Sequence, residues 1–230
     1  MTLVAQDSFE RSVAAGANWG TADLGGAWSR QGSTSPEYSV AGGVGIHQLI
    51  TPGSQGGQLL AGISEADIEI LVLNTWDETA LGANLFPAGL LARYIDVDNF
   101  YSHQLRIDLA TPDQLETDIR SHVGGTSTGI SGGNVVVTAT MEVGSGYWTR
   151  FRVQGDELKV KVWEDGDIEP SAWLAEVTNS DHSAPGAIGT RYSTGGGSSN
   201  LPTITYDEFE ANSLDSVIQQ QQRIRSRRSR

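Results

Sequence analysis

The chain has 230 residues, no cysteine and a formal net charge of −13. The lack of cysteine excludes disulfides and thiolate metal sites, and no run of residues reaches the ~18 apolar positions that a membrane span needs. The first residues, MTLVAQDSFE, have neither the basic nor the apolar region of a secretory signal, so we expect folding in a cytosol. Five arginines lie in the last eight residues, so the rest is strongly acidic, and we expect neither a membrane nor nucleic acid as its partner.

Short stretches of alternating apolar and polar residues, separated by Gly, Asn, Asp and Pro, predict β-strands along most of the chain. Their regular spacing and the 28 glycines favour an all-β fold, a β-sandwich or jelly roll in one domain. The predicted strands are residues 3–10, 37–50, 66–73, 88–95, 100–108, 115–121, 134–142, 147–153, 158–164, 186–192 and 203–211.

One β-hairpin can be predicted residue by residue. The segments YWTRFRV and LKVKVWE flank Gly155 and Asp156, which suit a two-residue primed turn. Because side chains alternate along a strand, three cross-strand pairs face the core and three face the opposite way. The core pairs are Val153 with Leu158, Phe151 with Val160 and Thr149 with Val162. The opposite pairs are Arg152 with Lys159, Arg150 with Lys161 and Trp148 with Trp163.

The outward face of this hairpin brings like charges together, which is unfavourable without neutralising groups. The segment SEADIEILVL places Glu65, Asp67 and Glu69 in alternation with apolar residues, so a neighbouring strand can supply the acids. A ligand is the alternative: a glycan or acidic polymer lying across the two tryptophans, because apolar sugar faces stack on indole rings. The candidate ligand-binding residues are Trp148, Trp163, Arg150 and Lys161.

Metal sites find little support in the sequence. The four histidines are scattered, with no spacing typical of a zinc site. The turn Asp96-Val97-Asp98-Asn99 is rich in oxygen atoms, which calcium prefers, but it lacks the glycine and distal glutamate of a helix-loop-helix site. Asp96, Asp98 and Asn99 are therefore candidate calcium ligands, and a plain hairpin turn is the alternative; we predict no other cofactor.

The C-terminal segment departs from the β pattern. Asn212 stands three residues before Asp215, a variant of a capping box, and predicts a short helix. We therefore divide the chain into a body, residues 1–211, and an anchoring tail, residues 212–230. The tail can be a disordered end, dock an acidic groove on a partner subunit, or contact nucleic acid or another anionic polymer. The predicted partner-binding residues are Leu214, Val217, Ile218, Ile224, Arg225, Arg227 and Arg228.

Several stretches resemble a known family. They include DSFERSVAAGANWGTADLGGAWS, LLARYIDVDNFYSHQLR and NLPTITYDEF, and above all the pattern W-x-x-G-x-x-E-P-x-x-W at residues 163–173. Together they resemble the concanavalin A-like (laminin G-like) jelly-roll domains found in minor tail and other virion proteins of actinobacterial phages and in bacterial surface proteins. The resemblance runs from Asp7 to Phe209. It implies that the terminal strands pair, and that Trp173 folds back onto the sandwich after Pro170 ends a strand.

A hydrolase is one alternative that this resemblance raises. Glu65-x-Asp67-x-Glu69 is similar to the E-x-D-x-E strand of retaining concanavalin-like glucanases, in which the first Glu is the nucleophile and the last is the acid/base. Because side chains alternate along a strand, the three carboxylates would lie on one face of it. The backbones of Glu65 and Glu69 would then be about 13 Å apart. The carboxyl groups would have to lean inward to reach the ~5–5.5 Å of a retaining pair.

The resemblance implies a non-enzymatic virion protein, assembled in the host cytoplasm. Our first hypothesis is a phage minor tail protein whose jelly roll adheres to host-surface glycan and whose tail anchors it to other virion subunits. The tail can also join three copies of the chain in a homotrimer. A capsid decoration protein without a ligand is the second hypothesis, and a glucanase-type glycoside hydrolase is the third. Fold alone does not decide among them, because such sandwiches serve many functions.

Overall fold

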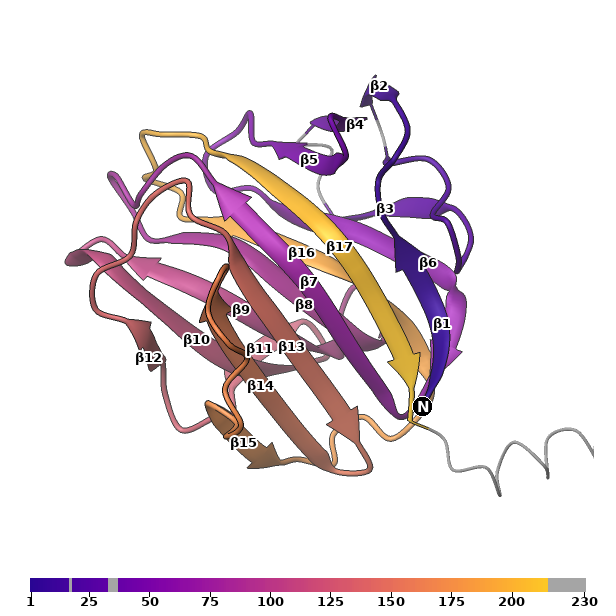
Figure 1. The fold of residues 1–230 in the computed structure, drawn as a ribbon. Helices are drawn as coiled ribbons and strands as arrows, with labels where there is room; N and C mark the ends of the chain where they lie inside the picture. Colours follow the sequence, from indigo (N-terminus) through magenta and orange to yellow (C-terminus); the bar gives the residue numbers. More distant parts are fainter. Residues whose placement is uncertain (17, 33–36, 215–230) are drawn as a thin grey trace, which may run out of the picture.

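The structure is a computed structural model that describes residues 1–16, 18–32 and 37–214, and these form two antiparallel β-sheets packed face to face (Figure 1). The all-β prediction is therefore confirmed. The nine-stranded sheet has the order β15 (Ala175–Thr178), β14 (Glu157–Glu164), β13 (Tyr147–Gln154), β7 (Ile68–Trp76), β17 (Thr203–Ser213), β5 (Val44–Gln48), β4 (Glu37–Ala41) and β2 (Val13–Gly16), with β1 (Thr2–Asp7) paired to β17.

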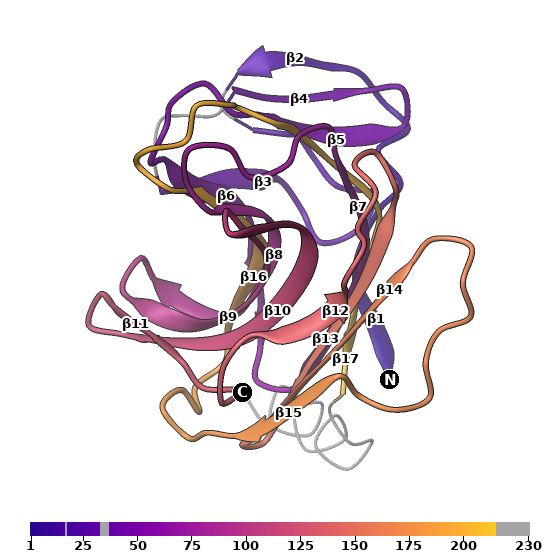
Figure 2. The same ribbon diagram turned by 90° about the vertical axis from the view of Figure 1, so that its left-hand side faces the viewer.

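The second sheet has eight strands and is strongly curved, so that its outer face, turned away from the first sheet, is concave (Figure 2). Its order is β11 (Thr126–Gly129), β10 (Thr111–Val123), β9 (Asn99–Asp108), β8 (Leu85–Asp96), β16 (Gly186–Thr194), β6 (Gln55–Glu65) and β3 (Trp28–Gly32), with β12 (Val135–Thr138) paired to β10. Over the described ranges, no helix has the length and apolar character that crossing a membrane would require.

The core lies between the two sheets and follows the alternation of the strands. In β7, Ile68, Ile70 and Val72 are fully buried, as their period-2 spacing predicts. Near the N-terminus the core is aromatic: the His47 imidazole stacks on Trp19, with ring centroids 4.7 Å apart, and meets Tyr206 at 4.6 Å. Aromatic pairs in such offset and edge arrangements add to the stabilisation from burial alone.

The two terminal strands pair, as the resemblance implies. In the β1–β17 ladder Asp7 lies opposite Phe209. The Asp7 carboxylate is fully buried and accepts hydrogen bonds from Trp28 Nε1 at 2.7 Å and from the Arg11 guanidinium at 2.6 and 2.8 Å. A buried carboxylate is stable when it is both paired and hydrogen-bonded. This contact therefore ties the start of the chain to the sandwich.

Each predicted strand overlaps a strand of the structure, but residues 37–50 form two strands, and β2, β3, β6, β11 and β15 were missed. The clearest miss is the start of β6, because the composition of SQGGQ is more typical of a loop than of a strand. A Cβ on Gly57 would lie 1.8 Å from the Thr190 carbonyl oxygen, and one on Gly189 would lie 2.1 Å from the Gln58 carbonyl oxygen. The glycines here permit close approach of β6 and β16 rather than a turn.

The strand β17 continues to Ser213, two residues past the predicted end of the body. Asn212 lies in this strand, opposite Leu3 and Glu69, so its predicted role as a helix cap is wrong. The Leu214 backbone N–H extends the same pattern by donating to the Asp67 carbonyl oxygen at 2.9 Å. The rest of the predicted helix, including Val217, Ile218, Ile224 and the arginines, lies outside the described residues, so the anchoring role stays a prediction.

Candidate functional site

The predicted hairpin forms with the predicted register. All six predicted cross-strand pairs occur between β13 and β14, including Trp148 with Trp163 and Arg150 with Lys161. Gly155 takes a φ of +55°, which glycine adopts without penalty at the first position of a primed turn. The outward face of this hairpin, here called the basic ladder, therefore carries the like charges that the sequence predicts.

Carboxylates neutralise the basic ladder, as the first of the two alternatives predicts. The strand β7 lies beside β13 and places Glu69 opposite Arg152. The Glu69 side chain is buried and accepts hydrogen bonds from Arg150 Nη1 at 2.7 Å and from Arg152 Nε at 2.6 Å. One buried carboxylate thus joins two arginines of the ladder.

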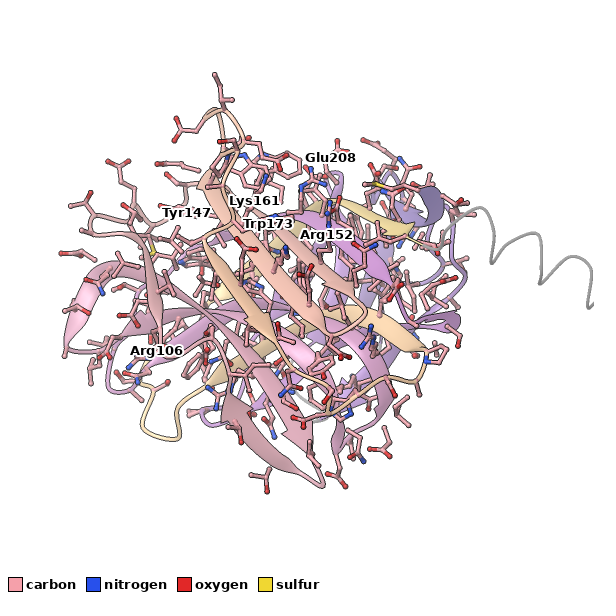
Figure 3. The ribbon with its side chains drawn as sticks, turned by 90° about the horizontal axis from the view of Figure 1, so that it is seen from below. Arg106, Tyr147, Arg152, Lys161, Trp173 and Glu208 are labelled. Atoms are coloured by element: carbon pink, nitrogen blue, oxygen red, sulfur yellow. The ribbon has the colours of Figure 1, made fainter. Side chains whose placement is uncertain are left out.

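A second carboxylate comes from the segment that follows β14. Glu169 accepts from Arg150 Nε at 2.9 Å and from Lys161 Nζ at 3.0 Å. Burial alone would raise the pKa of Glu169, but these hydrogen bonds lower it below its ordinary value. Trp173 lies over the cationic groups of Arg152 and Lys161, 5.0 and 4.9 Å from the ring, and these side chains are grouped together in Figure 3. The predicted return of Trp173 onto the sandwich is confirmed, but β14 already ends at Glu164, so Pro170 does not end a strand as predicted.

The two tryptophans of the predicted ligand site contact each other. The Trp148 and Trp163 rings are stacked, with centroids 6.2 Å apart and planes 14° from parallel, and both side chains are half-buried. Trp148 Nε1 donates to the Asp165 carboxylate at 2.8 Å. Trp163 also lines an open pocket of about 600 Å³ with Val137, Ile168 and Pro170, among others. Of the four predicted residues, the tryptophans are available to a ligand, while Arg150 and Lys161 are engaged by carboxylates.

The glucanase-like arrangement of Glu65, Asp67 and Glu69 does not form. The strand β6 ends at Glu65 in the eight-stranded sheet, and β7 begins at Ile68 in the other sheet, so no single strand carries the three carboxylates. Glu65 accepts from Ser213 Oγ at 2.9 Å, and Asp67 accepts from the Gly155 backbone N–H at 2.9 Å. The predicted catalytic strand is therefore wrong, because the chain changes sheets inside the motif.

The oxygen-rich segment Asp96–Asn99 is the turn between β8 and β9. Asp96 Oδ1 accepts from the Asp98 backbone N–H at 2.9 Å and from Asn99 Nδ2 at 2.8 Å. Asn99 Oδ1 in turn accepts from the Gly124 backbone N–H at 3.1 Å. These contacts are typical of a hairpin turn stabilised by its own side chains. Across the part of the chain that the structure describes, no three His, Asp or Glu side chains group as metal ligands would.

A second polar hollow lies elsewhere, on the concave face of the eight-stranded sheet. Two adjoining pockets, of about 320 and 400 Å³, share Gln55, Ser127 and Arg191, and together form what we call the concave groove. The first, the histidine pocket, contains Phe100, His122 and Asp98. The second, the arginine pocket, is lined by Gln55, Phe86, Gln104, Arg106, Arg120, Ser127, Asn134, Arg191 and Ser193.

Phe100, at the floor of the groove, belongs to a small apolar cluster separate from the main core. Leu59, Leu91 and Phe100 are buried together there, although their strands turn these side chains away from the opposite sheet. Phe100 stacks on His122, with ring centroids 4.0 Å apart and planes 16° from parallel. The Arg191 guanidinium lies over the Phe100 ring at 5.3 Å, an arrangement that favours a cation. His122 and Arg191, packed against the buried Phe100 ring, therefore form the floor of the groove.

His122 is an uncharged part of this floor. Burial, together with nearby Arg191 and Arg120, lowers the pKa of His122 to about 3. Its Nε2 forms a 2.9 Å hydrogen bond with Ser102 Oγ. At neutral pH the imidazole is therefore a neutral aromatic surface rather than a proton donor of ordinary strength.

Arg191 differs from its neighbours in the groove because no carboxylate pairs with it. Arg106 pairs with Glu116 at 2.5 Å and with Asp108, and Arg120 pairs with Asp118 at 2.8 Å. Arg191 takes part in none of the ion pairs between described residues and donates to the neutral Gln55 Oε1 at 3.0 Å. Burial and the charge of Arg120 lower the pKa of Arg191 to about 10, so it stays protonated at neutral pH.

No pattern in the sequence points directly to this groove. Arg191 was assigned to the predicted strand 186–192, and Phe100 and Gln104 to the predicted strand 100–108, without a common surface. Alternation indicates which residues of one strand share a face. It does not indicate which strands, distant in sequence, become neighbours across a curved sheet, and β16 lies between β6 and β8 here.

The two antiparallel sheets, one strongly curved, define a concanavalin A-like jelly-roll sandwich. Among solved structures, the chain is similar to the CBM2 module of an evolved Dit protein of Lactobacillus casei BL23 phage J-1, with a TM-score of 0.63, 12% identity and coverage of 91% of this chain and 94% of that one. It is also similar to the exoplasmic/lumenal domain of VIP36 in its Ca²⁺/Man-bound form, with a TM-score of 0.58, 13% identity and coverage of 82% and 84%.

A third similar structure comes from endo-acting O-glycanases of the human gut microbiota, with a TM-score of 0.60, 12% identity and coverage of 93% of this chain and 100% of that one. No family model matches the sequence, and no curated protein matches it. At these identities the likeness is one of fold.

Proposed function

We propose that the protein is a glycan-binding module and that the concave groove is its binding site. The observation that carries this proposal is one continuous hollow in which amide, hydroxyl and guanidinium groups surround the half-buried ring of Phe86, next to the buried Phe100–His122 stack. Sugars present both an apolar ring face and many hydroxyls, so a site of this composition matches them. The names of the similar structures support the proposal: a CBM, or carbohydrate-binding module, a mannose-bound domain and a set of O-glycanases.

The polar rim has the right chemistry to hold sugar hydroxyls. Gln104, Asn134 and Ser193 line the arginine pocket, and each carries a side chain that can donate and accept. Phe86 lines the same pocket and offers an apolar ring surface. Such a site binds through a few hydrogen bonds and one stacking contact.

The stacked tryptophans of the basic ladder are a second candidate for the glycan site. Both rings are half-buried, and Trp163 borders an open pocket of about 600 Å³, which keeps the predicted stacking contact available. The concave groove is favoured over them because its polar groups face open space, whereas the cations next to the tryptophans are engaged by Glu69 and Glu169.

A glycan array with the full-length protein, followed by calorimetry on the best ligand, tests the proposal. We expect Gln104→Ala and Phe86→Ala to weaken binding at least tenfold, and Trp148→Ala and Trp163→Ala to leave it within twofold. The opposite pattern would place the site on the basic ladder. A protein that melts normally but binds no glycan on the array would contradict the proposed function.

We further propose that the module works in a phage particle, as a minor tail protein assembled in the host cytoplasm and held by its C-terminal tail. The sequence resemblance supports this setting, and so does the phage origin of the Dit protein with a similar fold. A capsid decoration protein is the alternative.

The anchoring role of the tail can be tested in the assembled particle. Because β17 includes Asn212 and Ser213, the deletion should begin at residue 215 to keep the sandwich whole. We expect this deletion to abolish incorporation into particles while the melting temperature stays unchanged. Normal incorporation of the shortened chain would show that the tail is not the anchor.

A further inference from the structure

We propose that the concave groove is selective for a sugar that carries an anionic substituent, a carboxylate or a sulfate, and that Arg191 binds this group. The inference rests on the proposed glycan-binding function and adds a ligand class to it. Two observations support it: the distribution of charge in the groove, and the contacts of Arg191, which include Gln55 and Phe100 but no carboxylate of a described residue.

The chain as a whole is acidic, with 28 Asp and Glu against 15 Lys and Arg. Of the ten Lys and Arg residues outside the C-terminal tail, eight form ion pairs with carboxylates in the described structure. The two exceptions are Arg30 and Arg191. Arg30 donates to the Gly16 carbonyl oxygen at 3.4 Å and lies over the Tyr38 ring, away from the groove. Arg191 is the exception that lines a pocket.

The arginine pocket is unusual for this acidic protein because its lining contains three arginines and no carboxylate. Two of them, Arg106 and Arg120, already have acidic partners on their own or adjacent strands. The third, Arg191, is near Arg120, whose positive charge opposes it. The carboxylates that pair with Arg106 and Arg120 do not line the pocket, so the charged groups that face it are all guanidinium groups, which favours an anion there.

A partly buried guanidinium without a carboxylate loses solvation that its hydrogen bond to Gln55 does not fully restore. An incoming carboxylate or sulfate would restore it, because guanidinium binds both groups through paired, charge-assisted hydrogen bonds. The Arg191 stack on Phe100 fixes the position of this charge before the ligand arrives. The amides and hydroxyls of Gln55, Gln104 and Ser193 remain for the uncharged part of the sugar.

The charge distribution also indicates which pocket holds the anionic end of the glycan. Asp98 lines the histidine pocket, at the far side of Arg191 from the arginine pocket, and its carboxylate would repel an anion. We therefore place the anionic substituent in the arginine pocket and a neutral part of the glycan in the histidine pocket.

The test compares full-length wild-type protein with two matched variants, Arg191→Gln and Arg30→Gln, each of which removes one arginine that has no carboxylate partner. The probes are oligogalacturonate and alginate oligosaccharides for carboxylates, a chondroitin sulfate oligosaccharide for sulfate with carboxylate, sulfated dextran for sulfate alone, and xylan and mannan oligosaccharides as neutral glycans. Binding is measured by calorimetry at low and at moderate salt.

We expect at least one anionic probe to bind tenfold or more tightly than any neutral probe, and its affinity to fall with salt. Arg191→Gln should weaken that binding at least tenfold, while Arg30→Gln should leave it within twofold. The carboxylate-only and sulfate-only probes then show which group Arg191 binds.

Three results would overturn the inference. In the first, neutral glycans bind in the groove as tightly as anionic ones and Arg191→Gln has no effect. The proposed glycan-binding function would then stand, but the preference for an anionic sugar would be refuted. Binding of a single-stranded oligonucleotide that depends on Arg191, with no glycan bound, would mean a different class of partner. Binding of no probe would overturn the inference together with the proposed function.

Discussion

Both sheets carry arginines on their outer faces, but the charge partners of these arginines differ. On the nine-stranded sheet, Arg150 and Arg152 share the buried carboxylate of Glu69, and Glu169 and Trp173 cover the remaining charge. On the eight-stranded sheet, Arg191 has a neutral glutamine and an aromatic ring as partners, and another arginine nearby. The cations of the first face all pair with carboxylates, whereas on the second face Arg191 lacks the counter-charge that Arg106 and Arg120 have.

This difference separates arginines that stabilise the fold from an arginine available to a ligand. A partly buried ion pair restores to each group much of the solvation that it loses, so removing one partner is costly. A cation without a carboxylate partner contributes little to the stability of the fold, so its position at a pocket needs another explanation. The predictions below test whether the two faces differ in this way, beginning with the largest expected effect.

Glu69→Gln should lower the free energy of unfolding by about 3 kcal/mol, because it leaves two partly buried arginines without their shared carboxylate. Urea unfolding at pH 7 measures the change. The control is Glu176→Gln on β15, an exposed partner of Lys159, which should cost no more than about 0.5 kcal/mol. Equal effects of the two variants would show that the basic ladder is not held by Glu69.

The second prediction concerns acid, to which the two faces should respond in different pH ranges. The folded-state pKa of His122 in the groove is about 3, below the ordinary value of 6.5. The unfolded chain therefore binds a proton there that the folded chain does not, and stability present above about pH 6.5 is lost as the pH falls toward 3. The lowered pKa of Glu169 on the ladder has its effect only below the ordinary value of 4.5.

His122→Phe tests this order, because it keeps an aromatic ring on Phe100 and removes the titrating group. Between pH 6 and 4 the free energy of unfolding of this variant should fall less steeply than that of wild type, by about 1.4 kcal/mol per pH unit. The measurement is a series of urea titrations across that range. The loss of the hydrogen bond to Ser102 shifts the whole curve without changing its slope. Parallel curves for the variant and wild type would contradict the assigned state of His122.

The basic ladder was largely predictable from the sequence, and the groove was not. Residues 147–164 are one hairpin, so alternation and a Gly155 turn fix every pair in it, and charge repulsion alone calls for an acid such as Glu69. The same rule failed at Glu65, because the chain leaves one sheet and enters the other between Glu65 and Ile68. Alternation has no information about which sheet a strand joins.

The groove depends on contacts between strands far apart in the chain. Gln55 and Arg191, joined by a hydrogen bond, are 136 positions apart. The β6–β16 contact that brings them together depends on Gly57 and Gly189, and the segment around Gly57, SQGGQ, has a composition more typical of a loop than of a strand. Long-range pairing of this kind is a property of the jelly-roll topology, so it became visible only in the three-dimensional structure.

The smallest expected effect is also the sharpest test of the comparison. Arg191→Gln should change the free energy of unfolding by less than about 0.5 kcal/mol, because it removes a cation that has no ion pair and that Arg120 opposes. Arg152→Gln, which removes a partner of Glu69, should instead cost about 1 to 2 kcal/mol. The two variants delete the same group from half-buried positions on opposite sheets, and urea unfolding compares them directly. If Arg191→Gln costs as much as Arg152→Gln, Arg191 is a structural residue like those of the ladder, and its place in the groove needs no ligand to explain it.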